Sequence, residues 1–172
     1  MRWSRVSPVL YDGHLWGSFF AASASVAATL TGLLFVALSI NLQRILAHPS
    51  LPQRAAETLA TFATVLLTAL IGLIPEQSGH ALGLEILGLS VPVWIASTVL
   101  QRRVLRPDTV SGSGWKVFRI VALQLAALPF VAGSLGLVFH AWGGLGWIAT
   151  GTLLALTMGI LNAWVLMVEI VR

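Results

Sequence analysis

The sequence predicts an all-α integral membrane protein: a bundle of five transmembrane helices joined by short loops. Hydrophobic residues make up 57% of the 172 residues, whereas charged residues make up 9%. A soluble domain has roughly 25% charged residues, so this chain lacks the side chains that would cover a water-facing surface. The length of the apolar runs agrees, because each reaches the roughly 20 residues that a helix needs to cross a bilayer.

Turn-forming residues divide the chain into five apolar runs. Prolines, glycines and polar residues cluster at residues 48–52, 75–79, 107–114 and 143–144, where they favour turns over helix. No linker is long enough to lead to a second domain, so residues 1–172 are predicted to form a single membrane domain. Its predicted spans are residues 15–45, 54–74, 81–100, 115–139 and 145–171.

The first run has two interpretations. Arg2 and Arg5 precede an apolar stretch, which is the arrangement of a secretory signal peptide. The apolar region of a signal peptide is only about 7–15 residues long, whereas this run carries no charge from residue 15 to residue 43. We therefore expect a retained spanning helix that exceeds the bilayer thickness, with Asn41 and Arg44 at a hydrated end.

The distribution of Lys and Arg predicts the orientation in an inner cell membrane. Among Lys and Arg residues, the N-terminal segment and the loops at 75–80 and 140–144 contain only Arg2 and Arg5. The positive-inside rule then places the N-terminus outside and the C-terminus in the cytoplasm. The same rule explains the net charge of +4 without a nucleic-acid partner. The other side carries Arg44, Arg54, Arg102, Arg103, Arg106, Lys116, Arg119 and Arg172.

Five of those basic residues form a cluster between the third and fourth runs. Such a cluster is expected to contact anionic lipid of the inner leaflet, at about 1 kcal/mol per near-surface charge. Orientation alone also accounts for it. The members of this basic cluster are Arg102, Arg103, Arg106, Lys116 and Arg119.

The sequence contains no recognisable catalytic centre, and we expect neither an enzyme nor a cofactor. It has no HExxH, GxSxG, Walker A or GxGxxG motif and no cysteine. His14, His80 and His140 fall on the predicted outer side and could meet at a metal, but we expect ordinary solvated histidines at the membrane interface and no metal site. No charged residue lies near the centre of any run, which argues against a proton-coupled transporter and a voltage sensor.

A polar stripe runs along the second run. At 100° per residue one side of this helix carries hydroxyls and a glycine, whereas leucines occupy the other side. The stripe either lines a pore shared among copies of the chain, with a carboxylate at each mouth that favours cations, or forms a seam in which each hydroxyl bonds to its own helix. Its members are Glu57, Thr61, Thr64, Thr68 and Gly72, with Glu76 just beyond them.

Two other runs carry faces of small residues, which allow close approach of helices in lipid. On the fifth run the face is Gly151, Ala155, Gly159 and Ala163, and we expect packing within the chain. On the first run it is an alternative pore lining or a subunit interface. Its members there include Ser25, Thr29, Gly32 and Ser39.

Isolated polar residues and prolines within the spans suggest contacts between helices. Gln124 and Asn162 are expected to form hydrogen bonds across helices. Pro92 and Pro129 fall in mid-span, where each removes one helical hydrogen bond and favours a kink.

Together these features predict a small homo-oligomeric inner-membrane pore for small ions, with a preference for cations. The lining would come from the second run and also from the small face of the first. The alternative is a non-catalytic accessory subunit that binds and regulates a larger membrane protein, for which surfaces alone are sufficient. A lipid or small-solute transporter is a third class. Membrane lipids are partners in every case.

Overall fold

The computed structural model describes residues 12–48, 51–104 and 113–171, and it is all-helical over them, with 89% helix and no strands. Four helices are long and apolar enough to cross a membrane: α1 (Gly17–Ile40), α3 (Leu51–Gly72), the Gly79–Val99 part of α4 (Gly79–Val104) and the Gly144–Glu169 part of α6 (Gly144–Val171). In α5 (Ser113–Val138) the described apolar stretch is the shorter Gln124–Val138. These helices are those of a multi-pass membrane protein.

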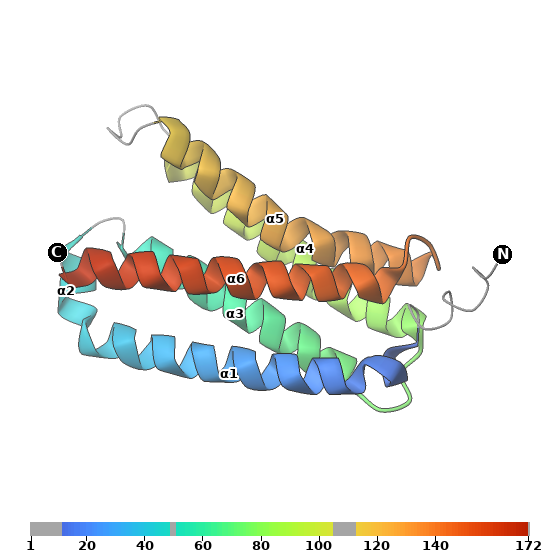
Figure 1. Cartoon of the computed structure of the whole chain (residues 1–172). Helices are drawn as coiled ribbons and strands as arrows, with labels where there is room; N and C mark the ends of the chain where they lie inside the picture. Colours follow the sequence, from blue (N-terminus) through green and yellow to red (C-terminus); the bar gives the residue numbers. More distant parts are fainter. Residues whose placement is uncertain (1–11, 49–50, 105–112, 172) are drawn as a thin grey trace.

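The helices form an elongated bundle in which α3 lies at the centre (Figure 1). Helix α3 contacts α1, α4 and α6, and α5 packs between α4 and α6. Accordingly 44% of the apolar window of α3 is buried, against 22% for α1, which has α3 as its main neighbour. Most of α1 therefore faces outward.

The first predicted span is interrupted, and the expectation of one continuous helix over residues 15–45 is wrong. A 3-10 turn η2 (Gly13–Trp16) precedes α1, which ends at Ile40, and a separate helix α2 (Leu42–Ala47) follows. The Asn41 side-chain amide donates to the carbonyl oxygen of Ala37 at 2.9 Å, the acceptor that the Asn41 N–H would use in a continuous helix. Helix α2 then buries Ile45 beside Leu51 and closes one end of the bundle, which we call the α2 end.

The other predicted boundaries agree with the structure to within a few residues. Helix α3 begins at Leu51 because Pro52 fits the first turn of a helix, where no N–H is required. Between α3 and α4 the hydroxyl of Ser78 accepts a hydrogen bond from the N–H of Ala81 at 3.2 Å, which caps α4.

At the opposite end of the bundle, glycines bring α5 and α6 into backbone contact. A Cβ atom on Gly133 would lie 2.8 Å from the carbonyl oxygen of Gly144 and 2.9 Å from the nitrogen of Ile148. A Cβ atom on Gly136 would lie 2.7 Å from the carbonyl oxygen of Ala141. We call this the glycine end, and its close contacts leave no room for a side chain.

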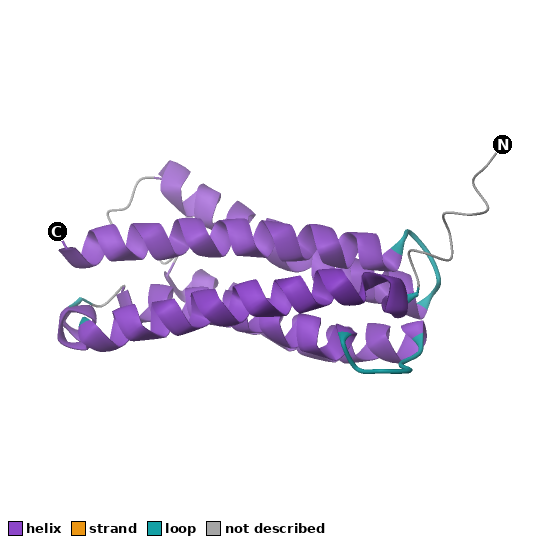
Figure 2. Ribbon diagram, turned by 60° about the horizontal axis from the view of Figure 1, so that its bottom comes forward, coloured by secondary structure: helices purple, strands orange, loops and turns teal. Residues whose placement is uncertain are grey.

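Toward the α2 end, α4 and α5 diverge from α6 and α1 (Figures 1 and 2). Pro92 and Pro129 lie within these two helices. The indole N–H of Trp94 donates to the side-chain oxygen of Gln124 at 2.8 Å and joins α4 to α5, as predicted for Gln124. The α4–α5 pair is thus fastened to the rest of the bundle at the glycine end and separates from it toward the α2 end.

Candidate functional site

The threonine stripe of α3 faces the interior of its own chain. Thr58, Thr64 and Thr68 are buried, and Thr61 is partly buried. The stripe is expected to face a neighbouring helix or water, and in the structure these threonines lie against other helices of the same chain. Thr61 donates to the carbonyl oxygen of Glu57 at 2.9 Å and Thr64 to that of Ala60 at 2.7 Å, the bonds to the same helix that the seam interpretation expects.

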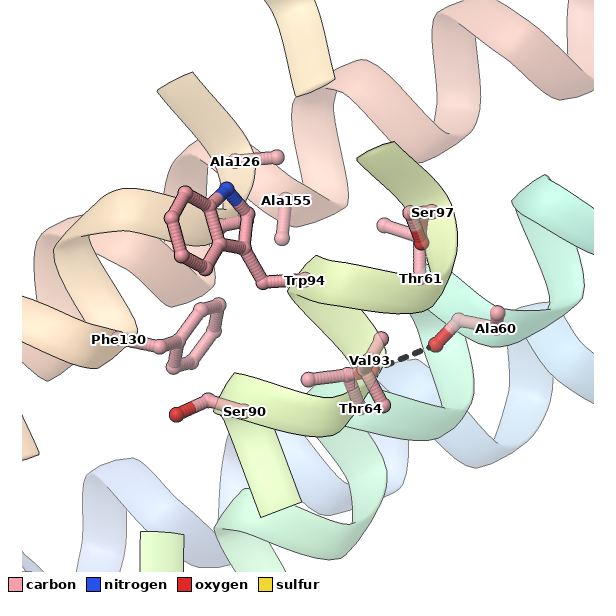
Figure 3. Close-up of a pocket in the computed structure, with 11 residues that line it drawn as sticks. Ala60, Thr61, Thr64, Ser90, Val93, Trp94, Ser97, Ala126, Phe130 and Ala155 are labelled. Atoms are coloured by element: carbon pink, nitrogen blue, oxygen red, sulfur yellow. Dashed lines mark hydrogen bonds between the residues drawn. The ribbon is translucent and has the colours of Figure 1, made fainter. Parts of the chain in front are cut away.

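A pocket lies at half the length of the bundle, between α3, α4, α5 and α6 (Figure 3). We call it the central pocket. A water molecule can occupy about 30 Å³ of it, which is room for one or two waters. Its polar and aromatic lining is Thr61 and Thr64 of α3, Ser90, Trp94 and Ser97 of α4, and Phe130 of α5.

The α4 side of this pocket belongs to a second polar stripe that the sequence analysis missed. Ser90, Trp94, Ser97 and Gln101 follow one another at intervals of four, three and four residues, so they share one face of α4. Gln101 is buried at the α2 end. The helical periodicity that identifies the α3 stripe in the sequence also identifies this one. We call the two facing stripes together the α3–α4 seam.

Among the residues that the structure describes, three buried hydroxyls of the seam region have no hydrogen-bond partner: those of Thr68, Ser90 and Thr98. Ser90 is 4% exposed and Thr68 is 1% exposed. Figure 3 shows the Ser90 hydroxyl on the same side of α4 as the Phe130 ring. A buried polar group without a partner costs about 1–3 kcal/mol, so each of these hydroxyls requires an explanation.

The seam continues beyond the central pocket toward both ends of the bundle. Toward the α2 end, Glu57 accepts a hydrogen bond from the amide of Gln53 at 2.8 Å. Toward the glycine end, a second cavity lies at Gly72, Gln77 and Leu82, and a water molecule can occupy about 210 Å³ of it. We call it the terminal pocket. Glu76 is exposed in the adjoining turn.

An apolar barrier separates the two pockets. Thr64 and Gly72 are eight residues apart, or about 12 Å along the helix, and Thr68 lies midway. Val65 and Ile86 are buried in the same hydrophobic cluster, and the ring of Phe20 fills the space beside Gly72. The seam is thus polar on both sides of a dry section that contains one hydroxyl.

The small face of α1 lies on the outside of the chain. Ser25, Thr29, Gly32 and Ser39 are exposed, and a Cβ atom on Gly32 would meet nothing within 4 Å. The Ser25 and Thr29 hydroxyls donate to the carbonyl oxygens of Ala21 and Ser25, at 3.0 and 2.8 Å. The face therefore presents hydroxyl oxygens with free lone pairs and no free donors at these two residues.

On α6 the small residues pack within the chain, as predicted. Gly151 lies against Phe130, Gly159 against Phe62, and Ala155 is buried. At the α2 end, Arg54 of α3 and Glu169 of α6 form an ion pair. Asn162, in contrast to the expectation of an interhelical bond, lies on the exposed side of α6.

The other predicted sites gain no support from the described residues. Within them no group of three or more His, Asp or Glu residues could hold a metal ion. His80 lies 3.3 Å from the carbonyl oxygen of Val138, whereas the side chain of His14 is outside the described part. The basic cluster is outside it too: Arg106 entirely, and Arg102, Arg103, Lys116 and Arg119 in their side chains.

Comparison of the chain with protein-family models, with curated proteins and with solved structures finds no match.

Proposed function

We propose that this chain conducts small ions, with a preference for cations, along the α3–α4 seam inside each protomer. The observation that carries the proposal is the pair of facing polar stripes at the central pocket, with unpartnered hydroxyls buried at membrane depth. Polar groups in a membrane protein commonly mark solute or ion pathways, because lipid-facing positions disfavour them. The dry section around Thr68 then acts as a gate that opens on wetting.

The proposal includes five membrane spans, with α5 as the fourth. Helix α5 has 26 residues, more than a bilayer crossing needs. Helix α1 begins at the glycine end and α6 ends at the α2 end, which fits an odd number of crossings (Figure 1). With the positive-inside rule, the α2 end is cytoplasmic in an inner membrane and Glu57 lies near the inner mouth.

The preference for cations follows from the groups along the seam. Thr61 and Thr64 donate their protons to their own helix, so their oxygens offer only lone pairs to a solute. Glu57 and Glu76 place carboxylates toward the two ends. Oxygen acceptors and carboxylates attract cations and repel anions.

Thr64→Leu tests the conduction path. We expect this variant to abolish ion flux in liposomes that contain the purified chain, because the leucine side chain fills the central pocket without a hydroxyl oxygen. Thr157→Leu is the matched control, since Thr157 also bonds to its own helix but lies exposed on α6. Equal flux through both variants, or no flux through the unmodified chain, would contradict the proposal.

A second candidate function is an accessory subunit that binds another membrane protein through α1. The exposed small face of α1 favours it, because such faces allow helices to approach closely in lipid. Contacts of this face with another protein, or with a second copy of the chain, are also compatible with conduction within each protomer.

Cross-linking tests the accessory role, and the chain suits it because it has no cysteine. In native membranes Gly32→Cys is expected to give one adduct of fixed mass with a different protein, whereas Thr157→Cys on α6 gives none. A dimer of this chain would show that the face joins copies instead. Absence of any adduct would contradict association through α1.

A further inference from the structure

We propose that the central pocket is a binding site for one dehydrated monovalent cation of the ammonium type, recognised by the π face of Trp94. This inference rests on the proposed function and names the species that the path selects. Its size limit comes from the cavity, where a water molecule can occupy about 30 Å³. A cavity of 150 Å³ accommodates benzene, so the space inside the central pocket suits a water-sized species.

The lining chemistry points to a cation. The described lining contains no basic side chain and no carboxylate. Thr61 and Thr64 offer lone pairs only, because their protons are donated to Glu57 and Ala60. A ligand that donates hydrogen bonds satisfies these oxygens together with the unpartnered Ser90 hydroxyl, which is 4% exposed.

Trp94 supplies the second attraction. Its indole N–H donates to Gln124 of α5, so the only hydrogen-bond donor of the ring is already bonded. The ring itself lines the pocket (Figure 3). Phe130 adds a second ring to the lining. The negative face of an aromatic ring attracts a desolvated cation, and tryptophan does so most strongly. Oxygen acceptors beside an aromatic wall distinguish ammonium from divalent cations, which retain their water.

The first test compares ion flux in liposomes that contain the purified chain, using ammonium, choline and Mg²⁺ as chlorides. We expect ammonium to pass, choline to be excluded by size and Mg²⁺ by its hydration. Trp94→Leu should lower the ammonium flux about 2- to 30-fold, the range of one cation–π contact, and Trp94→Phe should restore part of it. Trp164→Leu is the matched control, because it is the same substitution at a tryptophan of α6 that is 69% exposed and does not line the pocket.

The second test measures binding without flux. Ammonium chloride should raise the Tm of the detergent-purified chain relative to choline chloride at equal ionic strength, because a ligand of the folded state stabilises it. Trp94→Leu should lose this difference, and Trp164→Leu should keep it.

The two measurements separate the site from the conduction path. Flux that Trp94→Leu leaves unchanged overturns the ammonium site and leaves conduction standing. An ammonium-dependent Tm without flux supports the site and overturns conduction. Osmotic water flux without any cation flux or Tm difference means that the pocket holds water, and it overturns both.

Discussion

Gly133→Ala is expected to destabilise the protein by about 1–3 kcal/mol, although alanine is normally the better helix former. The added methyl group would overlap the carbonyl oxygen of Gly144 and the nitrogen of Ile148. Both are backbone atoms of α6, so neither can turn aside as a flexible side chain would. The two helices must separate, and the contact that fastens α4 and α5 to the bundle is lost.

Gly88→Ala provides the matched control for this prediction. Gly88 lies in α4, and a Cβ atom there would meet nothing within 4 Å. The substitution is chemically identical, so we expect it to be neutral or to stabilise the chain by up to about 1 kcal/mol. Thermal unfolding of both variants in the same detergent measures the difference. Equal stability would mean that α5 and α6 are not in close contact at the glycine end.

The helices themselves were predictable because a bilayer imposes a length and an apolar composition on each span. The break at Asn41 was not, since it depends on a side-chain amide that replaces one backbone hydrogen bond. A hydropathy average over many residues does not detect a single side chain that competes with the backbone for one carbonyl oxygen. A polar residue near the end of an overlong apolar run was the signal, and it was interpreted only as a sign of hydration.

The candidate site was predictable in part. Periodicity showed that Thr61, Thr64 and Thr68 share one side of a helix and that lipid does not suit that side. It did not show which helix covers them, because a stripe defines a face but not its neighbour. A pore between copies and a seam within one chain were therefore both compatible with the sequence. The structure puts Ser90 and Trp94 of the same chain on the pocket wall opposite the stripe.

The small-residue face of α1 was also visible as a periodic pattern in the sequence, but no helix that the structure describes covers it. Its small residues predict either a subunit interface or an alternative to the α3 stripe as a pore lining. Only the tertiary structure distinguishes the covered stripe of α3 from the uncovered face of α1. Helix α1 packs mainly against α3 and leaves Ser25, Thr29 and Gly32 uncovered. A periodic face on a helix thus predicts that the face makes a contact. Which helix it contacts can be read only from the arrangement of the helices in the structure.

Thr68→Val is expected to make the chain more stable and less conductive. Valine has nearly the shape of threonine, and it removes a hydroxyl that is buried at 1% exposure without a partner. Removing a buried unsatisfied group is worth about 1–3 kcal/mol in favour of the folded state. The same change makes the section between the central and terminal pockets entirely apolar, so it resists wetting and ion flux falls to that of protein-free liposomes.

Thr64→Val separates this effect from a general effect of threonine replacement. The Thr64 hydroxyl bonds to the carbonyl oxygen of Ala60, so its removal gives no comparable gain in stability. Thermal unfolding of both variants gives this comparison, and liposome flux is measured for Thr68→Val against the unmodified chain. Lower stability of Thr68→Val would mean that its hydroxyl has a partner in the membrane, such as a bound water. Higher stability with undiminished flux would show that ions do not pass Thr68. The proposal requires the opposite, because it explains the destabilising Thr68 hydroxyl by a need for it in conduction.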